Sequence, residues 1–227
     1  MLGRYLGGMQ LAKLKKKIPS AIYGLLEKKG FYVLRPCQAK AIDAGLFKDK
    51  NLLVCTPTAS GKTLVAELAA LNAIYHDQGK VVYVVPLRAL ASEKVKDFKK
   101  DYPELKVALT SGDMDATDAY LEKYQWIVTT SEKLDSLLRH QVSWVRDIKV
   151  VVIDEIHLLN DPSRGPTLEV LITLLRKLLK PQLVGLSATI GNAKELAAWL
   201  DAKLVLDDWR PVRLDKGVYL EGKAEFW

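Results

Sequence analysis

The sequence predicts an α/β protein built on a doubly wound, mostly parallel sheet flanked by helices. Short apolar runs alternate with longer segments of helical periodicity, an order that generates right-handed βαβ units. Most of these runs are apolar throughout, which is the pattern of strands buried on both faces. Polar and charged residues directly follow several runs, at the strand ends where ligands bind in sheets of this kind.

Composition narrows the class of protein. The chain has 227 residues, of which 49% are apolar and 27% charged, and this suits one large globular domain. Its apolar runs are shorter than the roughly 18 to 20 residues that span a bilayer. The lysines of residues 1–20 follow the apolar part of that segment, the wrong order for a secretory signal. We therefore expect a cytoplasmic protein with no membrane segment.

Charge and cysteine content add two limits. The net charge of +7 permits nucleic-acid binding, although solvated helix faces by themselves account for runs such as KLKKK. Cys37 and Cys55 form no CxxC pattern, so we expect neither a zinc site nor a disulfide framework.

The predicted elements follow one another along the chain. Residues 1–30 are expected to form a helical lead-in that ends at Gly30. Strands are predicted at NLLVC, KVVYVV, LKVALT, WIVTT, VVVIDE, QLVGLS and AKLVLD, and helices at residues 63–76, 88–100, 131–139, 167–180 and 193–200. The main domain is expected over residues 31–210. Residues 211–227 are strand-like, and we interpret them as the start of a connection to a second domain that is absent from this chain.

The segment TPTASGKT, residues 56–63, follows the first buried strand and precedes a helix. Amides at a helix N-terminus can surround phosphates, Lys62 would contact the β and γ phosphates, and the Thr63 hydroxyl would bind Mg²⁺. Thr56 stands where the motif expects its first glycine, so on this motif alone an ordinary strand-to-helix turn stays open. The predicted nucleotide-binding residues are Thr58, Ala59, Ser60, Gly61, Lys62 and Thr63.

A second apolar strand, in VVVIDEIH, ends in two acids. Carboxylates at such a position are costly unless they bind a cation or have another polar task. Asp154 is positioned to hold Mg²⁺, and Glu155 to accept a proton from the water that attacks the γ-phosphate of ATP. The alternative is an acidic turn beside a solvated His157. We expect this strand to neighbour the phosphate-loop strand, which would make Lys62, Asp154 and Glu155 one catalytic group.

With these motifs in place, the sequence resembles the first RecA-like domain, a P-loop NTPase fold, of superfamily 2 DExH-box helicases. DEIH matches the box, and LRPCQ, VPLRALASE, TTSEKLDSLLR and LSAT resemble the Q motif and motifs Ia, Ib and III in the family's order. SATIGNAKELAAWL followed by DDWRPVRL is similar to the archaeal Hjm-type DNA helicases, which belong to a wider group that includes exosome-associated RNA helicases. Relatives often replace the first P-loop glycine, as Thr56 does here. Ala59 stands where many of them keep a second glycine.

The resemblance implies an ATP-binding motor domain that acts on single-stranded or forked nucleic acid, with DNA favoured. Gln38 would read the adenine edge, and His157, Ser187 and Thr189 would couple the nucleotide site to the nucleic acid. The residues expected to contact phosphates of a bound nucleic-acid strand are Arg88, Thr129, Thr130 and Ser131. They lie at or just after the ends of predicted β-strands. A helix cap is the alternative role of Ser131, and TSGDMD at residues 110–115 is a weaker candidate. Tyr83 and the five tryptophans are expected to serve packing rather than base stacking.

A helicase motor of this kind needs a second RecA-like domain, whose motifs include arginines that stabilise charge on the transferred phosphate. The residues after Leu206 are too few to supply it. We therefore expect the isolated chain to be inactive in unwinding and weakly active or inactive as an ATP hydrolase. A related RNA helicase, a non-helicase P-loop ATPase and a non-catalytic module with the same fold stay open. The intact Lys62, Thr63, Asp154 and Glu155 argue against the last of these.

Overall fold

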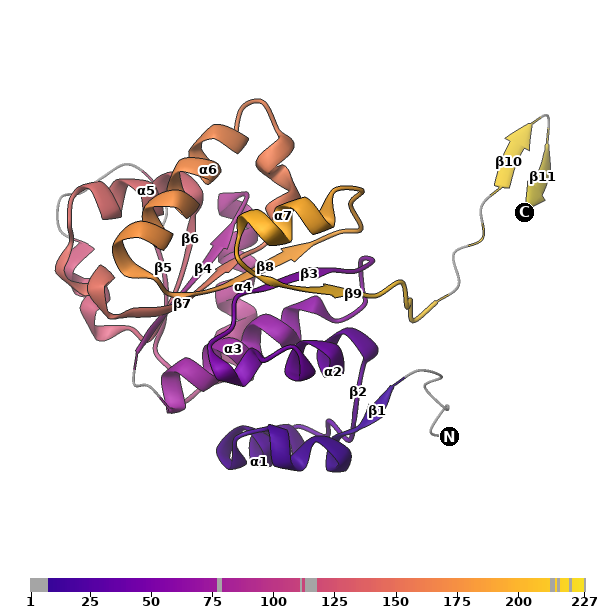
Figure 1. The fold of residues 1–227 in the computed structure, drawn as a ribbon, viewed down its shortest axis with the longest axis horizontal. Helices are drawn as coiled ribbons and strands as arrows, with labels where there is room; N and C mark the ends of the chain where they lie inside the picture. The colour runs from indigo at the N-terminus through magenta and orange to yellow at the C-terminus, as the bar shows by residue number, and fades with distance from the viewer. Residues whose placement is uncertain are drawn as a thin grey trace.

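The computed structural model describes residues 8–76, 79–110, 112, 118–212, 215, 217–220 and 222–226. A seven-stranded sheet lies at its centre, in the order β5-β6-β4-β7-β8-β3-β9 (Figure 1). Every strand pairing in this sheet is parallel. The predicted doubly wound parallel α/β fold is confirmed.

The elements of the sheet fall close to their predicted bounds. Its strands are β3 (Leu52–Cys55), β4 (Lys80–Val85), β5 (Val107–Leu109), β6 (Trp126–Thr130), β7 (Ile148–Ile153), β8 (Gln182–Ser187) and β9 (Lys203–Leu206). The helices between them are α3 (Lys62–Tyr75), α4 (Arg88–Asp101), α5 (Ser131–Arg139), α6 (Gly165–Leu174) and α7 (Ala193–Trp199). A π turn, Leu175–Leu179, extends α6, so the helix predicted over residues 167–180 changes its winding before it ends. No α-helix was predicted at α2 (Pro36–Asp43).

Two apolar cores cover the two faces of the sheet. Because successive side chains of a strand point to opposite faces, Val54 and Tyr83 belong to one core and Leu53 and Val82 to the other. Helices α1 to α4 lie on the first face and α5, α6 and α7 on the second (Figure 1). Strands covered on both sides in this way account for the nearly continuous apolar runs in the sequence.

The N-terminal segment packs into the first of these cores. It contains β1 (Met9–Gln10), a 3-10 turn (Leu11–Lys17), α1 (Ser20–Lys28) and β2 (Val33–Leu34), and β1 pairs with β2 in an antiparallel ladder. Its buried side chains in that core are Leu11, Leu14, Ile18, Ile22, Tyr23 and Leu26. The chain turns after α1 at Gly30, whose φ of 79° is left-handed.

The strand-like tail forms a small antiparallel hairpin of β10 (Gly217–Leu220) and β11 (Lys223–Phe226). The side chains of both strands are exposed, and Figure 1 draws the hairpin apart from the large sheet. Its role as a connection to a further domain, like the domain bounds themselves, stays a prediction. Among the residues described, no helix is both long and apolar enough to cross a membrane.

Candidate functional site

The phosphate loop connects the end of β3 at Cys55 with the start of α3 at Lys62. Gly61 precedes the helix with a φ of 96°, a conformation that side chains disfavour. A Cβ at Gly61 would also lie 2.5 Å from Nε2 of Gln38. The left-handed backbone angle favours glycine at this position, and a side chain there would also displace the Gln38 amide.

Thr56, at the position of the missing first glycine, closes the loop through its side chain. Its hydroxyl lies 2.6 Å from that of Ser60, and both residues are buried. Its amide donates to the carbonyl of Ser187 at the end of β8 (3.2 Å). A threonine thus supplies a cross-loop hydrogen bond that glycine could not form. Ala59 is left-handed with a φ of 64°, which costs a non-glycine residue roughly 1–2 kcal/mol.

The start of α3 has the features of an anion site. Gly61 provides no side-chain cap, and the amides of the first turn of a helix have no partner within the helix, so they are available to an anion. The Lys62 ammonium donates to the carbonyl of Thr56 (3.3 Å), folded back across its own loop. Thr63 is partly exposed beside it, and Thr58 is exposed at the tip of the loop. The loop therefore presents a cation, a hydroxyl and free amides at one edge of the sheet.

The two acids follow the end of β7 at Ile153. The carboxylate of Asp154 accepts a hydrogen bond from the Tyr83 hydroxyl at Oδ2 (2.9 Å) and one from the amide of Glu155 at Oδ1 (3.1 Å). Glu155 is left-handed, with a φ of 51°, so the chain turns sharply between the two acids and the next segment. Burial, and then the charge of Asp154, raise the pKa of Tyr83 well above its usual range, so this hydroxyl stays a donor.

The expected adjacency of the two motif-bearing strands is wrong, because β8 lies between β7 and β3. Its last residue, Ser187, pairs with Cys55 and thereby lies beside the start of the phosphate loop. The strand that ends in Ser187, one of the predicted coupling residues, thus separates the phosphate loop from the acids. All three strands end at the same edge of the parallel sheet.

His157 lies between the acids and β8. Its Nδ1 atom is 3.4 Å from Oε2 of Glu155 and 3.4 Å from Oγ of Ser187. This places three predicted site residues in one continuous line of contacts. Thr189, the remaining predicted coupling residue, is exposed two residues beyond the end of β8.

Gln38 is buried on α2, against the phosphate loop. Its Oε1 atom accepts from the amide of Arg35 (2.8 Å), and its Nε2 donates to the carbonyl of Gly61 (3.1 Å). A side-chain amide has two donors and two lone pairs, so each end keeps one further capacity. In this structure Gln38 connects the N-terminus of α2 to the phosphate loop.

The four residues predicted to contact a nucleic-acid strand lie at the ends of β4 and β6. Arg88 begins α4 and is exposed, with its guanidinium near Gly112. Thr129 is fully buried, and Thr130 and Ser131 nearly so, so their side chains offer little surface to a bound strand. Helix α5 begins at Ser131, which makes it the first helical residue instead of the cap. Of the segment 110–115, residues 111 and 113–115 lie outside the described residues.

The residues predicted to bind Mg²⁺ fit that ion chemically. Mg²⁺ prefers oxygen ligands, keeps several waters and takes one or two carboxylates together with substrate phosphates. Asp154 offers a carboxylate oriented by two donors, and Thr63 offers a hydroxyl at the start of α3. No cluster of three or more His, Cys, Asp or Glu residues that could hold a metal occurs in the described part of the chain. A sparse donor set of this kind suits an ion that arrives with a nucleotide.

Sequence reasoning missed two residues of the site. The sequence predicts a packing role for Tyr83, which is fully buried, but its hydroxyl also donates to Asp154. A hydroxyl in the middle of an apolar strand needs a buried partner, which was the available signal. Arg35 donates from Nη1 to the carbonyl of Ala59 (2.5 Å), and nothing in the local sequence indicated this contact.

A phosphate loop and an acid pair at one edge of a seven-stranded parallel sheet define a RecA-like P-loop domain. The model of the DEAD/DEAH box helicase family matches residues 35–196. The chain belongs to this family.

Archaeal proteins described as ATP-dependent DNA helicase Hel308 are similar over most of the chain. The protein from Pyrococcus horikoshii is 52% identical over 93% of this chain, and that from Methanocaldococcus jannaschii is 51% identical over 90%. The chain spans only 29% and 18% of those two relatives. Hel308 proteins are the Hjm-type DNA helicases, so the expected resemblance to that group is confirmed.

A solved structure supports the same fold. The DUF1998 helicase MrfA bound to DNA superposes with a TM-score of 0.77 at 28% identity, covering 90% of this chain and 31% of that one. The same helicase bound to DNA and AMPPNP gives 0.76 over 89% of this chain and 30% of that one.

Proposed function

We propose that this chain is the first motor domain of an ATP-dependent DNA helicase, working with a second RecA-like lobe. The chain's similarity to proteins described as ATP-dependent DNA helicases, at about half identity, supports the class of activity. The observation that carries the proposal is the contact line from Glu155 through His157 to Ser187, whose strand borders the phosphate loop. Through these contacts, the state of the bound nucleotide can alter the end of strand β8.

The residues have distinct roles in this proposal. The amides around Gly61 and the Lys62 ammonium bind the triphosphate. Thr63 and Asp154 would hold Mg²⁺, which neutralises charge on the phosphates when bound. Glu155 accepts the proton of the attacking water, and His157 sits within contact distance to orient that carboxylate.

Nucleic acid would bind across the strand ends of β4 and β6. Arg88 supplies an exposed guanidinium there, and amides at the start of α5 supply further donors. Contacts of this type position a strand without reading its bases, as a motor that tracks along it requires. DNA is favoured over RNA because the relatives at about half identity are described as DNA helicases.

The test begins with nucleotide binding by the chain. Lys62→Ala is expected to abolish measurable binding of ATP with Mg²⁺, while Lys48→Ala, at an exposed lysine that precedes the opposite end of β3, keeps it. Unchanged affinity in Lys62→Ala would show that the loop does not bind the phosphates. Glu155→Gln should keep binding and, in a protein that includes the second lobe, lose turnover by roughly 10²–10⁴.

Strand binding and unwinding distinguish the alternatives. Tighter binding of single-stranded RNA than of DNA of equal length would favour the RNA helicase. ATP binding with no strand binding would favour a P-loop ATPase that is not a helicase. The 227-residue chain alone is expected not to unwind forked DNA, because the opposing arginines, worth roughly 10³–10⁵ in rate, come from the second lobe.

A further inference from the structure

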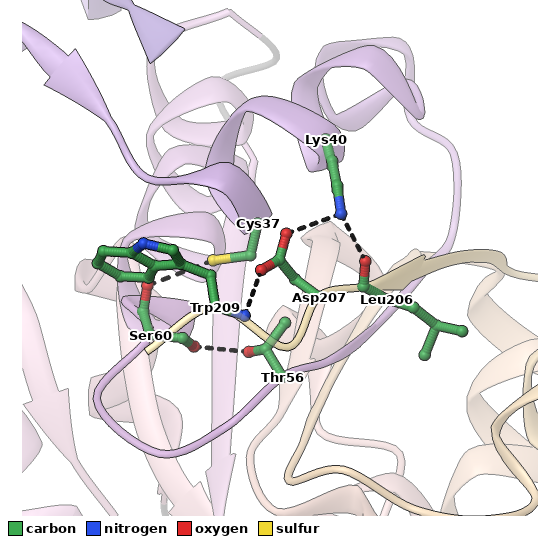
Figure 2. Close-up of polar contacts among 7 residues, drawn as sticks. All are labelled: Cys37, Lys40, Thr56, Ser60, Leu206, Asp207 and Trp209. Carbon is green, nitrogen blue, oxygen red and sulfur yellow. Dashed lines mark hydrogen bonds and ion pairs between the residues drawn. The ribbon is translucent and has the colours of Figure 1, made fainter. Parts of the chain in front are cut away.

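The segment that leaves the sheet after β9, residues 206–209, is called the exit segment here and is fixed where it begins. The Asp207 side chain is only 4% exposed and pairs with the Lys40 ammonium on α2 (2.8 Å). Its amide donates to the carbonyl of Cys55, the last residue of β3 (3.3 Å), and Lys40 donates to the carbonyl of Leu206 (2.9 Å). Figure 2 shows Lys40, Leu206 and Asp207 beside residues of the phosphate loop.

A single arginine joins the exit segment to the phosphate loop. The amide of Trp209 donates to Oδ1 of Asp207 (2.8 Å), so the ion-paired carboxylate also sets the backbone of the tryptophan (Figure 2). The central carbon of the Arg35 guanidinium lies 5.5 Å from the centre of the Trp209 ring system, within the range of a cation–π contact. Nη1 of the same guanidinium donates to the carbonyl of Ala59 (2.5 Å).

Arg35 also lies beside the amides that are expected to bind phosphates. A Cβ on Gly61 would be 3.3 Å from Nη1 of Arg35, and α3 begins at the next residue, Lys62. An arginine and a phosphate attract each other as opposite charges and often form two parallel hydrogen bonds, whereas the carbonyl of Ala59 has no net charge. A triphosphate in the loop would therefore compete with Ala59 for the guanidinium.

We propose that Arg35 senses the phosphates and passes their presence to the exit segment. When a triphosphate fills the loop, the guanidinium turns from Ala59 and the Trp209 ring to the phosphates, and the exit segment loses one of its contacts. Lys40 and Asp207 are positioning residues that keep the indole within reach of Arg35. The inference rests on the proposed function, because it requires the loop to bind a triphosphate. It gives the state of the nucleotide a second route, separate from the contacts of His157.

The experiment uses inorganic tripolyphosphate with Mg²⁺, which has no base or sugar that could touch the indole. Calorimetry measures its binding, and tryptophan emission measures the response of Trp209. The response of Trp209→Phe, which keeps the rest of the five tryptophans, is subtracted. We expect saturating tripolyphosphate to change the Trp209 emission. Unchanged emission despite measured binding would overturn the inference alone. A chain that binds neither tripolyphosphate nor ATP would overturn the proposed function, and the inference with it.

Arg35→Gln tests the sensor itself. It should remove the Trp209 response and lower tripolyphosphate affinity by at least about tenfold, the equivalent of one hydrogen bond to a charged group. Arg146→Gln, at an exposed arginine that precedes the start of β7 and thus the opposite edge of the sheet, is the control for lost charge and should change neither quantity. A Trp209 response that persists in Arg35→Gln would show that the signal does not pass through Arg35.

Asp207→Ala tests the positioning residues. It removes the acceptor of both Lys40 and the Trp209 amide, and the Lys40 side chain, 54% exposed, stays hydrated. We expect a smaller Trp209 response with unchanged tripolyphosphate affinity, because the phosphate contacts are intact. Asp207→Asn still offers an oxygen to the Trp209 amide and should keep most of the response. Loss of affinity in Asp207→Ala equal to that in Arg35→Gln would contradict a role confined to the exit segment.

Discussion

The Tyr83 hydroxyl donates a hydrogen bond of 2.9 Å to Oδ2 of Asp154, connecting the middle of β4 to the acid after β7. Tyr83 is fully buried and packs edge-on against Phe98 at a ring-centre distance of 5.3 Å. A rigid donor of this kind fixes the carboxylate that we propose binds Mg²⁺. The packing core and the candidate metal ligand are thus connected by one side chain.

Tyr83→Phe is expected to weaken the Mg²⁺ dependence of ATP binding, because Asp154 loses the donor that orients it. Removing an outer partner of a metal ligand typically costs roughly 10- to 100-fold in metal affinity. The measurement is ATP binding across a Mg²⁺ titration. Tyr102→Phe is the matched control, since that buried hydroxyl bonds Glu67 instead. Equal effects of the two changes would show that Tyr83 acts only in packing.

Arg88→Ala should weaken binding of single-stranded DNA to a similar degree for all sequences. If Arg88 contacts one phosphate, its loss reduces the slope of log affinity against log salt by about 0.7. Binding isotherms at several salt concentrations measure this slope. Lys100→Ala, at the far end of the same helix and also exposed, should leave the slope unchanged. A loss confined to one base composition would mean that Arg88 reads bases.

Ala59→Gly is expected to stabilise the fold by about 1 kcal/mol, because glycine relieves the left-handed strain at this position. Thermal or denaturant unfolding measures the change. The opposite sign is expected for Ala69→Gly in the middle of α3, where glycine costs about 1 kcal/mol or more. Destabilisation by both changes would contradict the strain assigned to Ala59.

Glu67 gives a pH-dependent prediction. Burial raises the pKa of this carboxyl above its ordinary value of 4.5, although the hydrogen bond from Tyr102 opposes the shift. The folded state then binds more protons than the unfolded state, so the charged form of Glu67 costs stability as the pH rises above 4.5. Below that pH the penalty is absent, because the carboxyl is protonated in both states.

Glu67→Gln should therefore raise the free energy of unfolding at neutral pH and change it little in acid. The amide oxygen can still accept the hydrogen bond from the Tyr102 hydroxyl. Denaturant unfolding at several pH values measures the difference between the two proteins. A gain of equal size at every pH would show that the shifted pKa is not its cause.

Local patterns determined much of this protein. The apolar runs predicted each strand of the large sheet, since a strand buried on both faces can contain few polar side chains. The phosphate loop and the acid pair were also predicted from residues that are close in sequence, Lys62 with Thr63 and Asp154 with Glu155. These features depend on short-range geometry, which the sequence displays directly.

Contacts between distant segments were decided only by the tertiary structure. The position of β8 between β3 and β7 depends on how the connections between strands cross the sheet. The apolar pattern of a strand does not show which strand it will pair with. The pairings of Tyr83 with Asp154 and of Lys40 with Asp207 join residues 71 and 167 positions apart. Such pairs form because a buried polar group must find a partner wherever packing brings one, and only the folded chain determines where that is.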